Sequence, residues 1–220
     1  MPVSFTEPRL PLLVVVEGEN DICFLKGMSR MLHRAFPELP DLSQLANDRR
    51  ITFLPTCGSN LKEWVSRLAS LQKREFYVFD REMEPETTGR RQLVEFINTR
   101  PGCLATLTTK RTVENYLHPM AIQEACGIEL FFDDDTNVAE LLALKLMAGR
   151  GETSWRELPY KRQRRLHDKA KKILNVKAVQ RMTPALLVEQ DPEGEVFGWL
   201  RRIQQMVEKE DVASGRLFMR

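Results

Sequence analysis

The chain lacks most features that would place it in a membrane, a zinc-binding module or a disulfide scaffold. Its four cysteines show no Cys-x-x-Cys spacing and have no histidine close by, which excludes the usual zinc patterns. The longest apolar run, Leu12–Val16, is too short to cross a bilayer, and no signal peptide is visible. A Walker A loop and a Gly-x-Gly-x-x-Gly turn are also missing. We therefore expect reduced thiols, a cytoplasmic location and no membrane partner.

What remains is the composition of an ordinary globular protein. Hydrophobic residues make up 42% of the 220 residues and charged residues 29%, which is enough apolar material for a full core. The net charge of +2 indicates little about partners, but the charges are unevenly distributed. Between Lys161 and Arg181 basic residues are frequent and Asp168 is the only acid. This stretch is either a surface for phosphate backbones or a solvated helix face.

The first half of the chain alternates between short apolar segments and amphipathic segments. Strands are expected at 11–16, 51–54, 76–79 and 103–107, separated by helices at 20–35, 61–71 and 90–97. Such alternation implies a parallel sheet with right-handed crossovers. After residue 118 only helical patterns continue, at 138–147, 161–174, 178–188 and 196–207. We predict an α/β fold with a small parallel sheet flanked by helices, residues 1–118, and a helical C-terminal half, residues 119–220.

Acidic side chains follow three of the four expected strands. Ligands of parallel sheets bind beyond the carboxyl ends of the strands, so these positions are the candidates for a site. The acids are Glu17, Glu19 and Asp21 after the first strand, Asp80 and Glu82 after the third, and Glu114 after the fourth. Clustered carboxylates repel one another unless a cation lies among them, and oxygen ligands suit Mg²⁺ or Mn²⁺. With basic side chains nearby, such a site suits phosphodiester chemistry, although each acid alone could equally be a surface or helix-end charge.

Four segments in order resemble a known family. Residues 14–21, Val-Val-Val-Glu-Gly-Glu-Asn-Asp, resemble the first motif of the Toprim domain, an apolar strand followed by Glu-Gly. Residues 76–82, Phe-Tyr-Val-Phe-Asp-Arg-Glu, resemble its second motif, an apolar strand ending in Asp-x-Asp. Residues 57–60 and 110–117 are similar to the glycine-serine turn and the Arg-x-x-Glu-Asn-Tyr segment of the OLD-like nuclease branch. The resemblance covers about residues 10–120.

This resemblance implies a metal-dependent nuclease that cleaves DNA or RNA with two Mg²⁺ or Mn²⁺ ions. The implied metal ligands are Glu17, Asp21, Asp80, Glu82 and Glu114. Glu17 and Asp80 would be catalytic, and Lys110 and Arg111 would contact the scissile phosphate. Glu82 stands where the family pattern has Asp. That departure keeps open an alternative, a catalytically inactive Toprim module that binds nucleic acid or a partner protein.

The resemblance also implies partners. OLD proteins usually join this domain to an ATPase, and no ATPase motif is present in this sequence. Stand-alone OLD-like proteins resemble effectors of anti-phage defence that are controlled by a separate ABC/OLD-type ATPase, and some of that group act on tRNA. We therefore expect a nucleic-acid partner, a separate ATPase, and a homodimer, since OLD-like Toprim domains often pair.

Overall fold

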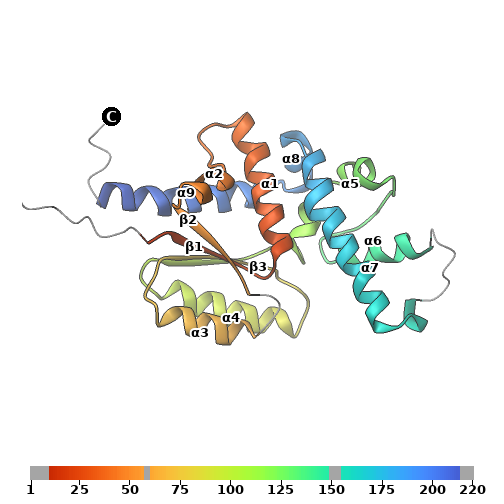
Figure 1. Ribbon diagram of the computed structural model, residues 1–220, viewed down its shortest axis with the longest axis horizontal. Coiled ribbons are helices and arrows are strands. Elements are labelled where there is room, and N and C mark those ends of the chain that lie inside the picture. Colours follow the sequence, from red (N-terminus) through yellow and green to blue (C-terminus); the bar gives the residue numbers. More distant parts are fainter. Residues whose placement is uncertain (1–9, 57–59, 149–154, 214–220) are drawn as a thin grey trace, which may run out of the picture.

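Four parallel strands form the centre of the molecule. The computed structural model describes residues 10–56, 60–148 and 155–213. Its strands are β1 (Leu12–Val16), β2 (Ile51–Pro55), β3 (Glu75–Phe79) and β4 (Cys103–Leu107). They lie in the order β2-β1-β3-β4, with Val14 paired to Phe53 on one side and to Phe76 on the other (Figure 1). The predicted α/β class with a small parallel sheet is confirmed.

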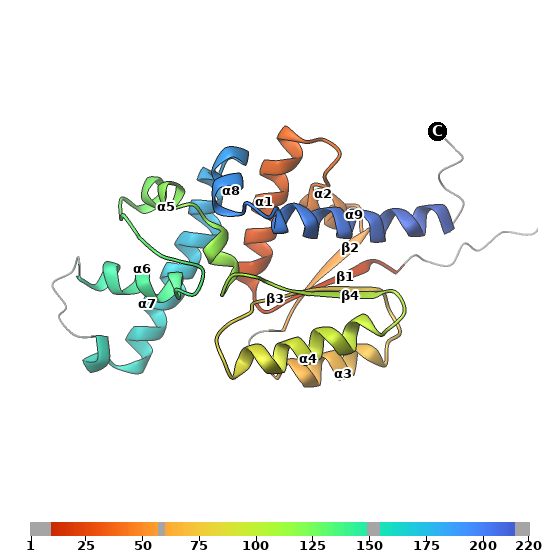
Figure 2. The ribbon, with the colours of Figure 1, turned by 180° about the vertical axis from the view of Figure 1, so that it is seen from behind.

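Helices cover both faces of this sheet. Helices α3 (Leu61–Ala69) and α4 (Glu86–Asn98) lie on one face, and α1 (Glu19–Ala35), α2 (Leu42–Asn47) and α9 (Glu195–Ala213) lie on the other (Figures 1 and 2). The strands contribute side chains to the apolar clusters on both faces of the sheet, because successive side chains of a strand point to opposite faces. Val15 and Tyr77 belong to the apolar cluster under α3 and α4, whereas Val14 and Phe76 belong to the cluster under α1. This two-sided burial explains the almost continuous apolar sequence of β1.

The second half is helical, as predicted. Its elements are η1 (Val113–Tyr116), α5 (Pro119–Cys126), α6 (Val138–Ala148), η2 (Trp155–Glu157), α7 (Tyr160–Lys172), the π-helical η3 (Ile173–Ala178), η4 (Val179–Arg181) and α8 (Pro184–Gln190). These helices share one apolar cluster with the sheet. The fully buried Trp199 meets Tyr116 edge-on, with ring centroids 5.2 Å apart. No helix in the described ranges has both the length and the apolar character needed to cross a membrane.

Two helices differ from their predicted limits. The helix expected at 90–97 begins earlier, at Glu86, so Gly89 and Arg90 lie inside its first turns. The continuous helix expected at 178–188 is wrong, since η4 ends at Arg181 and α8 starts at Pro184. Thr183 caps α8, because its hydroxyl accepts a hydrogen bond from a backbone N–H in the first turn. Proline is also well suited to the first helical position, where its missing N–H is not needed.

Candidate functional site: a buried carboxylate cluster

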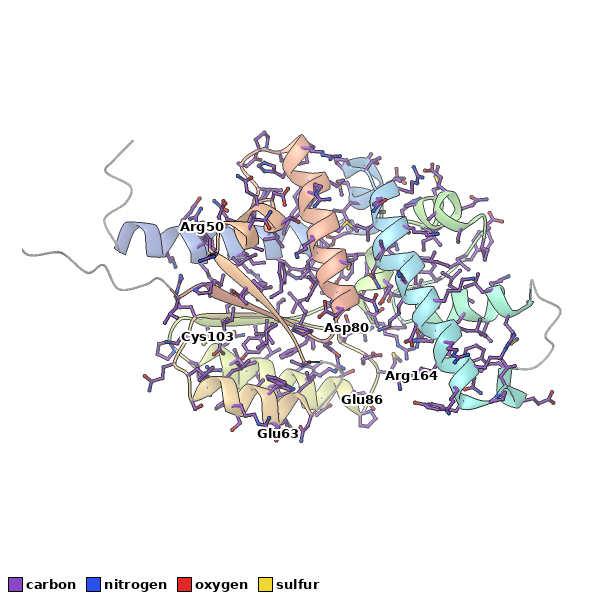
Figure 3. The ribbon with its side chains drawn as sticks, in the orientation of Figure 1. Arg50, Glu63, Asp80, Glu86, Cys103 and Arg164 are labelled. Carbon is purple, nitrogen blue, oxygen red and sulfur yellow. The ribbon has the colours of Figure 1, made fainter. Side chains whose placement is uncertain are left out.

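The candidate site lies at the carboxyl ends of two adjacent strands. β1 connects onward to β2, whereas β3 connects to β4 on the opposite side, so the sheet reverses its winding between β1 and β3. Such a switch point leaves a crevice in which ligands of parallel sheets bind. Glu17 follows β1 and Asp80 follows β3, and Figure 3 shows Asp80 close to the start of α1. Asp21, in the first turn of α1, and Glu114, in η1, complete a cluster of four carboxylates.

Glu17 is held by an arginine from α4. Arg90 forms a bidentate ion pair with Glu17, in which Nη1 binds Oε1 and Nη2 lies 2.9 Å from Oε2. The backbone N–H of Asp80 donates to Oε1 of Glu17 over 3.0 Å. Burial raises the pKa of Glu17, while Arg90 and the Asp80 bond act in the opposite direction. Glu17 is therefore held in position by the backbone of Asp80, which follows β3, and by the side chain of Arg90 in α4.

Asp21 and Asp80 are buried next to other acids. Asp21 accepts a hydrogen bond of 2.8 Å from the backbone N–H of Gly18, and Asp80 accepts one of 2.9 Å from that of Val113. Burial, followed by the charge of Glu114, raises the pKa of Asp21 to about 7. Burial and then the charges of Asp21, Glu17 and Glu114 raise the pKa of Asp80 well above its ordinary value. This mutual repulsion is the electrostatic condition that a bound cation relieves.

Glu114 meets two side chains from the C-terminal half. Nδ2 of Asn175 donates to Oε1 of Glu114 over 2.7 Å, and Nζ of Lys171 lies 4.0 Å from the same oxygen. Burial alone would raise the pKa of Glu114, but Lys171, Asn175 and Thr112 together hold it below its ordinary value. Lys171 has a raised pKa, caused first by Glu114 and then, against its own burial, by Asp21, Asp80 and Glu17. All four carboxylates of the cluster thus raise the pKa of Lys171.

A local helical irregularity places these two side chains. Lys171 is in the last turn of α7, and Asn175 lies within the π-helical η3 that follows directly. Asn175 is 1% exposed, so its position in η3 places the side-chain amide in the interior, where it donates a hydrogen bond to the buried Glu114. π-Helical turns inside α-helices occur frequently at functional sites. The C-terminal half therefore contributes a charge and a hydrogen bond to the site built by the sheet.

The remaining predicted residues form a second group beside the cluster. Glu82 has a left-handed φ of 55°, and its Oε2 accepts a hydrogen bond of 3.2 Å from Nε of Arg111. Arg111 also donates to the carbonyl of Asp135 over 3.2 Å. Lys110 is buried, forms an ion pair with Asp134 and lies 5.7 Å above the ring of Tyr116. Both basic side chains that were predicted to contact the phosphate are thus already paired with acids, Lys110 with Asp134 in the loop after α5 and Arg111 with Glu82.

The structure therefore divides the predicted site residues into two groups. It brings Glu17, Asp21, Asp80 and Glu114 into one electrostatic cluster, and Glu82 acts on it through its charge, which raises the pKa of Glu17. In the part of the chain that the structure describes, no three Asp, Glu, His or Cys side chains are grouped as ligands of one metal ion. Of the predicted turn at residues 57–60, residues 57–59 lie outside the described ranges.

Three residues of the site were missed by sequence reasoning. Arg90 stands at the start of the helix expected at 90–97, and its sequence neighbours do not connect it with Glu17. Lys171 was one of nine basic residues between 161 and 181, and it differs from the others in being only partly exposed. Asn175 carried no signal by itself. The spacing of four residues between Lys171 and Asn175 placed both on one helix face, and this was the only available hint.

Comparison with known proteins adds little. No family model matches the chain, and no curated protein matches it significantly. Three solved structures of the C-terminal region of the Xanthomonas campestris pv. campestris OLD protein match along most of their length. The mercury-phased structure is 15% identical, covers 90% of this chain and 96% of its own, and has a TM-score of 0.47; the iodine-phased structure is 14% identical with the same coverage and a TM-score of 0.45. At this identity and TM-score the similarity gives no information on the chemistry of the site.

Proposed function

We propose that this protein is a metal-dependent nuclease that hydrolyses phosphodiester bonds of nucleic acid. The observation that carries the proposal is the convergence of three buried carboxylates and the partly buried Glu17 at the switch point of the sheet, where burial and then mutual repulsion raise the pKa of both Asp21 and Asp80. Purely structural acids are seldom concentrated in this way, and strongly shifted pKa values beside a crevice favour a functional site. The sequence resemblance to the OLD-like Toprim branch supports the same conclusion.

The donor set suits Mg²⁺ or Mn²⁺ in its chemistry, because all four groups offer hard oxygen ligands. Asp21, Asp80 and Glu114 would hold an ion, and Glu17 would join them when it leaves Arg90; Glu82 would take part from the neighbouring group. Such an ion activates water and stabilises charge on the leaving oxygen. The present contacts of Glu17 and Glu114 explain why three acids are not gathered around one point: Arg90, Lys171 and Asn175 already engage them.

The protein's own residues have separate roles in this proposal. The N–H of Val113 fixes Asp80, and that of Gly18 fixes Asp21, so both carboxylates have defined directions. Lys171 is a cation beside the cluster that can offset the negative charge developing on a phosphate. Lys110 and Arg111 would reach a phosphate only by leaving Asp134 and Glu82, so we place them at the edge of the site.

Replacement of Asp80 by Asn tests the proposal. Asn removes the charge but retains an oxygen that can accept the hydrogen bond from Val113. Asp48→Asn is the matched control, because Asp48 is exposed and follows α2 at the other end of the sheet. Wild type and Asp48→Asn should cut plasmid DNA, single-stranded DNA or total tRNA in Mg²⁺ or Mn²⁺ and not in EDTA, whereas Asp80→Asn should lose at least about 100-fold. Equal cutting by Asp80→Asn would overturn the proposal.

A second function is binding without cleavage. The engagement of Glu17 by Arg90 favours it, because this acid is not free to bind a metal ion. A non-catalytic module would bind labelled DNA or RNA equally in Mn²⁺ and in EDTA, and Mn²⁺ would not raise its melting temperature. A nuclease should be stabilised by Mn²⁺ in wild type and less so in Asp80→Asn.

The sequence resemblance extends the proposal to anti-phage defence under the control of a separate ATPase. Expression of the wild-type chain alone in bacteria, compared with Asp80→Asn, tests this extension. A defence effector released from its partner should slow growth only when Asp80 is intact. A purified chain that is constitutively active but harmless on expression would contradict the extension.

A further inference from the structure

A cavity opens beside Glu17, between the first turns of α3 and α4. Its volume is about 270 Å³, and the residues that matter here are Glu17, Leu61, Lys62, Gly89, Arg90 and Leu93. These two helices lie side by side on the same face of the sheet (Figures 1 and 2). Because Glu17 and Arg90 belong to both the cavity and the carboxylate cluster, the cavity directly adjoins the cluster.

The lining combines an apolar surface with a few charges. Leu61 and Leu93 supply aliphatic walls, and Gly89 has no side chain to fill the space. A β-carbon placed at Gly89 would meet no atom within 4 Å, so this position faces open volume. Lys62 is exposed and makes no ion pair with any residue of the described part of the chain. Small-molecule sites typically have this composition, mainly apolar walls with a few placed polar groups.

We propose that this cavity is a subsite for one nucleotide of a nucleic-acid substrate. The base would lie against Leu61, Gly89 and Leu93, and the adjoining phosphate would meet Lys62 and, in exchange for Glu17, Arg90. The size supports a single unit, because about 270 Å³ falls just below the range of pockets for drug-sized ligands. The lining also offers two cations to a phosphate, Lys62 and Arg90, beside the two acids Glu17 and Glu86. This inference rests on the proposed function and adds a substrate class to it.

The substrate class is nucleic acid with unpaired nucleotides. The cavity is open to solvent. A base can lie against its aliphatic walls only after it has left its stack and its pairing partner, and this costs least in single strands, loops and ends. The pocket lining includes no aromatic ring on which a base could stack. Contact with aliphatic side chains should therefore tolerate all four bases, and we expect preference for structure rather than for sequence.

Filling the cavity tests the inference. Gly89→Leu would occupy the space, and leucine favours a helix over glycine, so the variant should be at least as stable as wild type. Gly198→Leu is the matched control, because Gly198 lies inside α9 and its β-carbon also meets nothing within 4 Å. The probe is a fluorescein-labelled twelve-nucleotide single strand in EDTA, followed by anisotropy, with the same sequence as a duplex for comparison.

We expect Gly89→Leu to weaken binding of the single strand about tenfold, because leucine would displace the bound base, and to leave the duplex nearly unchanged. Gly198→Leu should bind as wild type does. Equal binding of the single strand by Gly89→Leu and wild type would overturn the inference, as would equal binding of single strand and duplex by wild type. If Gly89→Leu unfolds, competition by adenosine monophosphate against the same probe on wild type replaces it, and absence of competition at millimolar concentration would count against the subsite.

Cleavage assays on the same samples separate the two proposals. If wild type cuts nucleic acid but Gly89→Leu cuts and binds single strands equally well, the nuclease stands and the subsite fails. If wild type cuts nothing but binds single strands in a manner that Gly89→Leu abolishes, the subsite stands and the nuclease fails.

Discussion

Lys171 places its ammonium group 4.0 Å from the carboxylate of Glu114. The two residues come from the two halves of the chain, Glu114 from the segment after the last strand and Lys171 from the end of α7. Glu114 is 1% exposed, and the side chain of Lys171 is 30% exposed. The contact therefore joins the helical half to the sheet through an ion pair, in which each half supplies one of the two charges.

Removal of the ammonium group should be costly. Lys171→Met keeps the length of the side chain but leaves Glu114 as a buried carboxylate without its cation, which we expect to cost about 3 kcal/mol of unfolding free energy. Lys172→Met is the control, because Lys172 is an exposed neighbour on the same helix. Urea denaturation measures both. The double variant Lys171→Met/Glu114→Gln should recover more than half of the loss, and a strictly additive cycle would show that the pair is not coupled.

The contribution of Asp21 to stability should fall as pH rises from about 4 to about 7. Asp21 binds its proton more tightly in the folded state, where its pKa is about 7, than in the unfolded chain, where it is 3.8. Between these values the folded state holds more protons, so the free energy of unfolding decreases with increasing pH. In EDTA, wild type should lose on the order of 2–4 kcal/mol between pH 4 and pH 7 through this group.

Asp21→Asn checks this pH dependence. The variant cannot titrate at this position, so its melting temperature should vary less over the same pH range than that of wild type. Mn²⁺ should remove much of the wild-type loss at pH 7, since a bound cation stabilises the ionised form. Identical pH profiles for wild type and Asp21→Asn would contradict the raised pKa of Asp21.

Two glycines in helices should respond oppositely to alanine. A β-carbon at Gly27 in α1 would overlap the side chain of Val179 in η4. Gly27→Ala should therefore destabilise the protein by roughly 1–3 kcal/mol, despite the better helix propensity of alanine. Gly198→Ala, which meets no neighbour, should stabilise it by up to about 1 kcal/mol. Thermal unfolding measures both, and restoration of Gly27→Ala by Val179→Ala would locate the strain at this helix contact.

A buried ion pair at the opposite end of the sheet should affect stability without affecting the site. Glu75 is fully buried, and its Oε2 lies 2.8 Å from Nη1 of Arg100 and accepts a hydrogen bond of 2.7 Å from Tyr77. This group lies near Cys103, away from Asp80 (Figure 3). Arg100→Met should cost about 3–5 kcal/mol, because it leaves a buried charge unpaired.

The exposed pair of Arg67 and Glu63 provides the comparison. Its side chains are 67% and 55% exposed, so Arg67→Met should cost less than about 1 kcal/mol. Cleavage per folded molecule should be unchanged in both variants, measured at a temperature where each is fully folded. Loss of cleavage in folded Arg100→Met would mean that this end of the sheet takes part in the site.

Local patterns predicted the sheet and the positions of its acids. β1 and β3 are short, apolar and followed at once by Glu17 and Asp80, so strand and acid were visible together. The break before α8 was also visible in principle, because Thr183 and Pro184 are a cap followed by a first helical residue. The role of Arg90 was not, because its pairing with Glu17 joins positions 73 residues apart and depends on how α4 packs. Lys171 was hidden among similar residues, and only burial distinguishes it. The assignment of the acids to metal binding stays a prediction.

The guanidinium group of Arg90 touches the ends of two strands at once, since it binds the carboxylate of Glu17 and the carbonyl of Asp80. The amide hydrogen of Asp80 donates to Glu17 in the same arrangement, so we expect it to exchange slowly with solvent. Any anion that draws Arg90 away would loosen both contacts together. The exchange rate of this one amide would therefore report whether the site is occupied, even in a variant that cannot carry out a reaction.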